Sequence, residues 1–166
     1  MLSKVNQGCK INSISKPPMQ ISTKSIFQPA ETEDGLRVLI TRYYPRGTRK
    51  DHFDYWIQAL APSRELLFQY KEGRITWSEF KITFLSEVRD NKDSLDAIHA
   101  LNDYARSEKI TLLCYERAGN PCHRHLVRDI IDDPRLLSAH FESKDADDEE
   151  RSFKPVLVSD QERLIP

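Results

Sequence analysis

Two cysteines, a histidine and an arginine crowd one short part of the chain, and these residue types are suited to chemistry. Cys114 lies near the end of the apolar run Ile110–Tyr115, and Cys122, His123 and Arg124 follow after a polar stretch. A thiolate is a nucleophile and a redox group, and a neighbouring cation stabilises its charge. This spacing predicts a reactive thiol or a polar anchor for an anionic ligand.

The elements expected around these residues place them at one edge of a sheet. The run Ile110–Tyr115 is apolar on both faces, as a central buried strand should be. Asn120 can cap a helix and Pro121 suits the first helical position, so a helix is predicted to begin there. Cys122 would then be the second helical residue, near unpaired N–H groups that favour negative charge. Open α/β sheets bind their ligands at this edge.

The predicted catalytic residues are Cys122, Cys114 and His123. Cys122 would be the nucleophile or redox group, tuned by the helix end and by His123. Both cysteines also have a simpler interpretation, because a free cysteine often packs as a small hydrophobic residue. A disulfide between them on oxidation is a further alternative.

A second group of side chains could hold a negatively charged substrate. The predicted substrate-binding residues are Arg37, Arg42, Arg46, Tyr43 and Arg124. If the strand predicted over residues 36–42 runs parallel to the central strand, Arg42 and Arg46 emerge at the same edge as Cys114. Guanidinium groups there would suit phosphate or carboxylate. Arg37 needs a partner if it is buried, for instance Glu116 or a ligand, and ordinary surface arginines are the simpler alternative.

No metal site is predicted, and the cofactor is left open. Cys114, Cys122, His123 and His125 offer four ligands, but the seven residues between the cysteines exceed the usual spacing of two to four. Adjacent helical side chains such as those of Cys122 and His123 also point in different directions. The chain has no Walker A, G-x-G-x-x-G or G-x-S-x-G motif.

The fold class predicted from the whole pattern is α/β, as a small single domain with a three-layer-like open sheet and a largely helical middle segment. Besides the central strand, strands are predicted over residues 23–28 and 36–42, and their short link favours antiparallel neighbours. Helices are predicted over Phe53–Leu60, after Ser63, after the capping box of Thr76 and Glu79, and from about Ser94 to Ser107.

Composition divides the 166 residues into three parts. Residues 1–18 are predicted to be a flexible extension, with Met19 as an alternative start, residues 19–133 to be the α/β domain, and residues 134–166 to be an acidic, partly disordered tail. No apolar run reaches the roughly 20 residues of a membrane span, so no membrane contact is expected. The three cysteines suit a reducing, cytoplasmic setting.

Three motifs together resemble a known family. EDGLRVLITRYYPRG (33–47), ALAPSREL (59–66) and ITLLCYERAGNPCHRHLV (110–127) occur in the order and spacing of the domain of unknown function family 488, and they are most similar to its YeaO-like branch. The resemblance covers about residues 19–132. It implies a compact α/β fold and a site at Cys114, Cys122, His123 and Arg124, the pattern of the wider family. Many YeaO-like members lack the cysteines, and the resemblance implies no reaction.

The function hypothesis from the sequence is a small cytoplasmic enzyme that acts on a phosphate- or nucleotide-like anion. The alternative is a non-catalytic module that senses a small ligand or associates with nucleic acid through the arginine-rich segment 37–50. The formal net charge of −1 and the acidic tail argue against nucleic acid. A structural protein is a third possibility, and the oligomeric state is left open.

Overall fold

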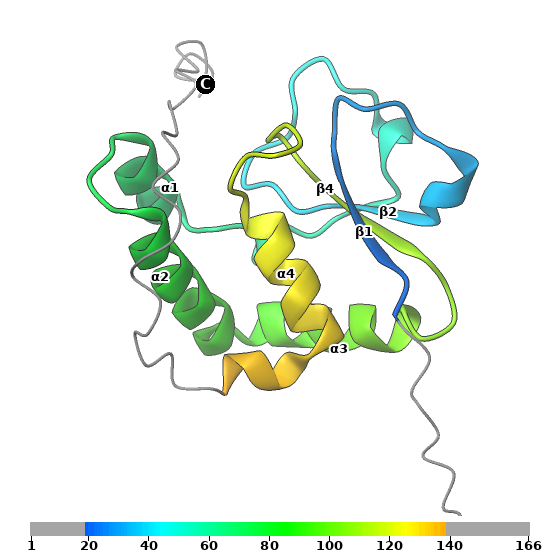
Figure 1. Ribbon diagram of the computed structural model, residues 1–166. Helices are drawn as coiled ribbons and strands as arrows, with labels where there is room; N and C mark the ends of the chain where they lie inside the picture. Colours follow the sequence, from blue (N-terminus) through cyan, green and yellow to red (C-terminus); the bar gives the residue numbers. More distant parts are fainter. Residues whose placement is uncertain (1–18, 139–166) are drawn as a thin grey trace, which may run out of the picture.

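Four parallel strands form the sheet, and the last strand in the sequence lies between the first two. The computed structural model describes residues 19–138. The strands are β1 (Ile21–Ser25), β2 (Leu36–Leu39), β3 (Tyr55–Trp56) and β4 (Ile110–Cys114), in the spatial order β1-β4-β2-β3 (Figure 1). Every residue of β4 is buried, which confirms the predicted central strand. The chain is therefore a small α/β domain, as predicted.

The prediction that the first two strands are antiparallel neighbours is wrong. β4 lies between them, and Ile110 of β4 is in register with Ile21 of β1 and with Leu36 of β2, both in parallel. The link over residues 26–35 contains the short 3-10 helix η1 (Thr32–Asp34). Ten residues reach roughly 33 Å when extended, which is enough to return to the starting edge of the sheet.

Four helices and three further 3-10 turns complete the fold. They are η2 (Lys50–His52), η3 (Gln58–Leu60), α1 (Arg64–Lys71), α2 (Trp77–Asp90), α3 (Lys92–Tyr104), α4 (His123–Asp132) and η4 (Pro134–Leu137). The predicted cap at Ser63 and the predicted capping box of Thr76 and Glu79 are both confirmed. Asn91 caps α3, so that helix begins two residues earlier than predicted.

The helix predicted over residues 53–60 is wrong, because β2 captures this segment as an edge strand. The backbone N–H of Asp54 donates to the Arg37 carbonyl at 2.8 Å, and that of Ile57 donates to the Leu39 carbonyl at 2.9 Å. The segment forms β3 and η3 instead of a helix. Hydrogen bonds to a strand distant in sequence have outweighed a local helical spacing of apolar residues.

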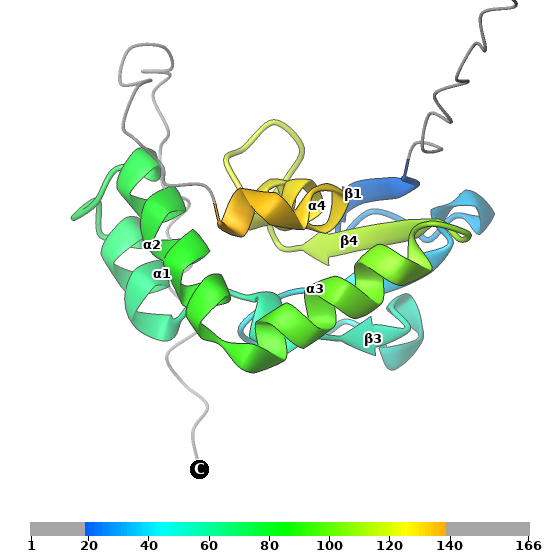
Figure 2. The ribbon, with the colours of Figure 1, turned by 90° about the horizontal axis from the view of Figure 1, so that it is seen from below.

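The two faces of the sheet are covered differently. Val38 and Leu112 lie on the face that packs against the helices and forms the main core. Leu39 and Leu113 lie on the opposite face, where loop residues such as Phe53 and Tyr115 cover them. Figures 1 and 2 show the helices gathered to one side of the strands. The third layer therefore consists of loops and 3-10 turns.

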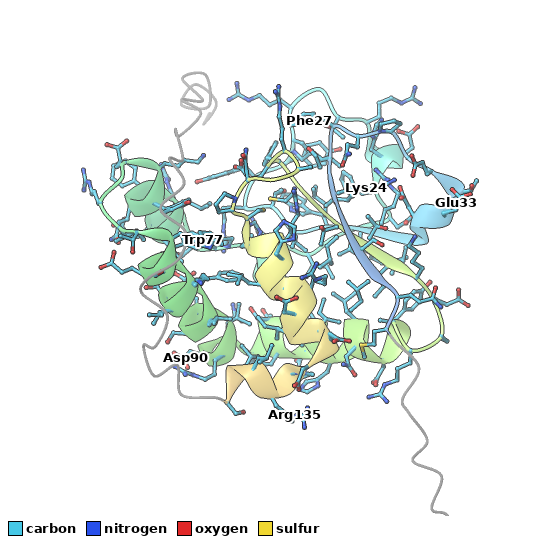
Figure 3. All side chains as sticks on the ribbon, viewed as in Figure 1. Lys24, Phe27, Glu33, Trp77, Asp90 and Arg135 are labelled. Carbon is cyan, nitrogen blue, oxygen red and sulfur yellow. The ribbon has the colours of Figure 1, made fainter. Side chains whose placement is uncertain are left out.

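A buried carboxylate on the loop face ties three strands together. Asp34 forms ion pairs with Lys24, which projects from β1 (Figure 3), and with Arg37 of β2. The Asp34 carbonyl accepts a hydrogen bond from the hydroxyl of Thr111 in β4 at 2.6 Å. Burial raises the pKa of Asp34, but the hydrogen bonds from Lys24, Glu31 and Arg37 outweigh it and lower this pKa.

The described fold continues past the predicted boundary at residue 133. Leu137 of η4 is buried in the main core, so the turn after Pro134 packs as part of the domain. The predicted extension over residues 1–18 and the acidic segment from residue 139 onward lie outside the described residues.

Gly35 provides a test of the close approach between β2 and β4. Its φ is +64°, and a Cβ there would overlap the carbonyl group of Lys109. We expect Gly35→Ala to lower the free energy of unfolding by about 1 kcal/mol for the left-handed backbone and by a further 1–3 kcal/mol or so for the overlap. Urea denaturation measures both contributions together.

Gly73→Ala is the matched control, because Gly73 has a φ of +67° and open space around it. This variant should lose only the backbone contribution of about 1 kcal/mol. Equal losses in the two variants would show that Lys109 does not approach Gly35 closely.

Candidate functional site

The imidazole of His123 is the centre of the candidate site. Its Nε2 lies 2.7 Å from the carbonyl oxygen of Ile40, directly after β2. Its Nδ1 lies 4.0 Å from the Cys114 sulfur and 3.9 Å from the Cys122 sulfur. The edge of the Phe84 ring packs against it with the centroids 5.6 Å apart. Because a carbonyl only accepts hydrogen bonds, Nε2 carries a proton and Nδ1 faces both sulfurs.

Two elements, β4 and α4, converge to place these side chains. Cys114 is the last residue of β4, Cys122 is the N-cap of α4, and His123 is the first residue of that helix. The predicted helix start at Asn120 is wrong, because α4 begins at His123. Cys122 has φ −153° and ψ 138°, so it is extended rather than helical. This conformation turns its sulfur toward Cys114, and both thiols are free.

The two thiols differ in their affinity for a proton. The neighbouring Cys122 thiol lowers the pKa of Cys114 well below its usual value despite burial. The charge of His123 and the backbone N–H of Glu116 act in the same direction. The Cys114 sulfur, together with burial, raises the pKa of Cys122. The structure therefore favours Cys114, rather than Cys122, as the thiolate.

The charge on Cys114 also affects its neighbours. Burial lowers the pKa of His123, but the Cys114 thiolate outweighs burial and raises it. Burial and the thiolate together raise the pKa of Glu116, and they raise the pKa of Tyr115 to about 12. These directions favour a negative charge on Cys114 beside a positive charge on His123, in a site shielded from solvent.

Arg124 braces the loop over the sulfurs instead of facing a ligand. Its guanidinium is buried and donates to the backbone carbonyls of Glu116 and Arg117, the latter at 3.1 Å. We call residues 115–121 the roof loop, since they connect Cys114 to Cys122 across the site. Arg124 holds the roof loop closed.

The early arginines of the sequence prediction do not gather around the sulfurs. Arg37 lies on the loop face, paired with Asp34 and donating to the His52 carbonyl at 2.8 Å, so its predicted pairing with Glu116 is wrong. Arg42 donates to the carbonyls of Ala61 and Pro62 at 2.7 and 2.8 Å.

Arg42 also lines a cavity of about 270 Å³ between η3, α2 and α3. The other polar side chains in its wall are those of Ser63, Glu87, Asp90, Asn91 and Ser94. Phe84 contributes to the same wall and also packs against His123, so the Phe84 ring separates this cavity from the site.

Arg46 and Tyr43 lie exposed at the carboxyl edge of the sheet. The Tyr43 carbonyl accepts a hydrogen bond from the Tyr115 hydroxyl at 3.3 Å, and the charge of Arg46 acts to lower the pKa of Tyr115. Both residues thus border the roof loop. The structure brings together Cys114, Cys122 and His123, and it places Arg46 near Tyr115 of the roof loop.

Three important groups were missed at the sequence level. The Ile40 carbonyl has no sequence signal, because any residue after β2 would supply one. Phe84 follows Phe80 by four residues, and this helical spacing indicates a core residue but gives no sign of the contact with His123. Glu116 was considered only as a partner for Arg37, although it lies two residues after Cys114 within the motif that carries the site.

A thiol and imidazole site at the carboxyl edge of a small parallel α/β sheet defines the class of protein. The family model described as the active DUF488-N3 subclade matches residues 21–135. The chain belongs to this DUF488, YeaO-like family, which confirms the resemblance seen in the sequence.

Curated relatives support the same assignment. The uncharacterized protein YeaO of Escherichia coli (strain K12) is 31% identical over 113 residues, covering 67% of this chain and 96% of the relative. The uncharacterized protein Rv3073c of Mycobacterium tuberculosis (strain H37Rv) is 30% identical over 74 residues, covering 43% and 63% respectively. No solved structure matches the chain. Within residues 19–138, none of the helices has the length and apolar character needed to span a bilayer.

Arg124→Met tests the role of Arg124 as the brace of the roof loop. Two loop carbonyls would lose their donor, which should lower the free energy of unfolding by about 1–3 kcal/mol and loosen the loop. Arg117 is exposed in that loop, so trypsin should cut after it faster than in the unmodified protein. Arg74 is exposed in another loop, so the rate of cleavage after it shows whether the variant has loosened the whole domain.

The control is Arg128→Met, on the same helix, where the side chain bonds to the neighbouring Asp129 and to no other residue of the range 19–138. This variant should leave cleavage at Arg117 unchanged. If Arg124→Met speeds cleavage at Arg74 and Arg117 equally, the brace is not specific to the roof loop.

Proposed function

We propose that this protein is a small cytoplasmic thiol-dependent enzyme that acts on a phosphate- or nucleotide-like anion. One observation carries the proposal: Cys114, Cys122 and His123 converge at the carboxyl edge of the central strand, with the His123 Nδ1 about equally far from the two sulfurs. A thiol, a base and a base-orienting group within contact distance are the parts of an activated nucleophile. Here the Ile40 carbonyl orients the base.

Cys114 is the nucleophile in this proposal, in place of the sequence-based choice of Cys122. Cys114 ends a buried strand whose backbone is fixed on both sides by β1 and β2. Cys122 stabilises the negative charge on the Cys114 sulfur beside it. His123 is the proton donor and acceptor.

The chemistry is a displacement in two balanced steps. The Cys114 sulfur bonds to the phosphorus of a phosphate ester as the bond from phosphorus to the leaving oxygen breaks, and the imidazolium of His123 gives its proton to that oxygen. Water then attacks phosphorus, the sulfur–phosphorus bond breaks, and the proton released by water returns to the imidazole. The thiolate and the imidazolium are both restored.

Features at the carboxyl edge support an anionic, ring-containing substrate. The N–H groups in the first turn of α4 favour negative charge. Arg117 is exposed within the roof loop, and Arg46 is exposed near Tyr115 of that loop. Aromatic rings border the same edge, including those of Phe27, which packs against Tyr115, and Tyr44, which packs against Trp56. Aromatic side chains of this kind stack on nucleobases.

Substrate must enter through the roof loop in this proposal. Cys114, Cys122 and His123 are each no more than 7% exposed. Residues Arg117, Ala118 and Gly119 of the roof loop are exposed and make up its outer part. Lifting these residues would uncover the sulfurs, as lids do in many enzymes. The description of the matched family model as an active subclade also supports an enzyme.

A second candidate function is a non-catalytic module that senses a small ligand or contacts nucleic acid. The exposed aromatic rings beside Arg46 and Arg49 favour it, since rings and arginines together bind single strands. Salt-dependent retention on a nucleic-acid column by a chain without turnover would support this candidate.

Turnover tests the proposed enzyme. We expect reduced full-length protein to release phosphate from some member of a panel of nucleotides and phosphate esters, with a phosphorylated Cys114 detectable by mass spectrometry after rapid quenching. Cys114→Ser should lower kcat at least about 1,000-fold, because the nucleophile is lost.

Cys9→Ser is the matched control, because Cys9 is the third cysteine of the chain and lies outside the motif of residues 110–127 that carries the site. It should retain full activity and still form the adduct. Turnover that survives Cys114→Ser, or an adduct found on Cys122 alone, would refute Cys114 as the nucleophile.

A further inference from the structure

We propose that Cys114, Cys122 and His123 also form a binding site for one thiophilic metal ion of the zinc class. Each residue offers one ligand atom, and the three atoms lie within 4.8 Å of one another. Around a zinc ion with bonds of about 2.3 Å to sulfur and 2.0 Å to nitrogen, tetrahedral ligand atoms stand roughly 3.5–3.8 Å apart. The sulfur-to-nitrogen separations of 4.0 and 3.9 Å need only a small contraction.

The orientation of His123 is the second observation. A metal-binding histidine commonly donates its other ring N–H to a carbonyl or carboxylate, which fixes the ring and its tautomer. The Nε2 of His123 lies 2.7 Å from the Ile40 carbonyl, and the ring is also held by the edge of Phe84. Nδ1 is therefore aimed between the two sulfurs before any metal arrives.

The structure answers both sequence-based arguments against a metal site, the divergence of adjacent helical side chains and the long gap between the cysteines. Cys122 and His123 are adjacent, but Cys122 is extended at the N-cap, so the two side chains converge instead of diverging as they would within a helix. The seven-residue gap between the cysteines is spanned by the roof loop, which returns the chain to the end of β4. The usual short cysteine spacing describes hairpin-like sites and does not apply here.

Charge and ligand type select the kind of metal. Two thiolates balance a divalent cation, so the loaded site is formally neutral, as a buried position requires. Sulfur and imidazole ligands favour Zn²⁺ and Cd²⁺ over Mg²⁺ and Ca²⁺. Three protein ligands leave one coordination position for water or a small ligand.

This inference goes beyond the proposed enzyme and can fail independently of it. A metal and a phosphate ester would compete for the Cys114 sulfur, so bound metal should inhibit turnover by the thiolate. Metal binding is measured without substrate, and turnover is measured in chelator, so each result stands alone.

The test uses reduced, metal-free, full-length protein and Cd²⁺ alone, followed by displacement with Zn²⁺. We expect one equivalent to bind, with the ultraviolet absorption of cadmium–thiolate bonds. The Cys9→Ser control should bind identically. Cys114→Ser, Cys122→Ser and His123→Gln should each weaken binding at least about 100-fold.

X-ray absorption on the zinc-loaded Cys9→Ser protein keeps the test independent of how the site variants fold. The expected coordination is two sulfur ligands, one imidazole nitrogen and one lighter ligand. A shell of oxygen and nitrogen alone, or the absence of stoichiometric binding at micromolar metal, would overturn the proposal.

Discussion

The hydrogen bond between the His123 ring and the Ile40 carbonyl is the interaction on which the site depends. It joins the first residue of α4 to the end of β2, across the carboxyl end of β4. Because the carbonyl can only accept, the bond fixes which nitrogen faces the sulfurs. Without it the imidazole could rotate, and neither the pair of Cys114 and His123 nor a metal site would be aligned.

That bond in turn requires a parallel sheet with β4 in the centre. Leu39 of β2 is in register with Leu113 of β4, so Ile40 and Cys114 leave the sheet side by side. An antiparallel pair would place them at opposite edges. On the loop face, the buried Asp34 and its partners Lys24 and Arg37 hold the strands in this arrangement.

The sequence predicted the central strand and the helix caps because those signals are local. The apolar run Ile110–Tyr115 and the cap at Ser63 depend only on neighbouring residues. The predictions from the sequence were wrong where hydrogen bonds to backbone groups distant in the chain determine the structure. β3 forms through backbone hydrogen bonds to β2, and Arg42 donates to the backbone carbonyls of Ala61 and Pro62. Backbone groups are the same in every residue, so a pattern of side chains does not reveal these bonds. Cys122 was misassigned for a related reason, since Asn120 offered a better local cap than the one used.

The protonation of the His123 ring is the measurement that tests this account most directly. Nitrogen NMR of the labelled, metal-free protein should show a slowly exchanging proton on Nε2, because that atom is buried against the Ile40 carbonyl. Cys114→Ser should remove only the proton on Nδ1, since the thiolate that favours it is gone. A ring protonated on Nδ1 with a bare Nε2 would contradict the account, because that ring could not donate to Ile40.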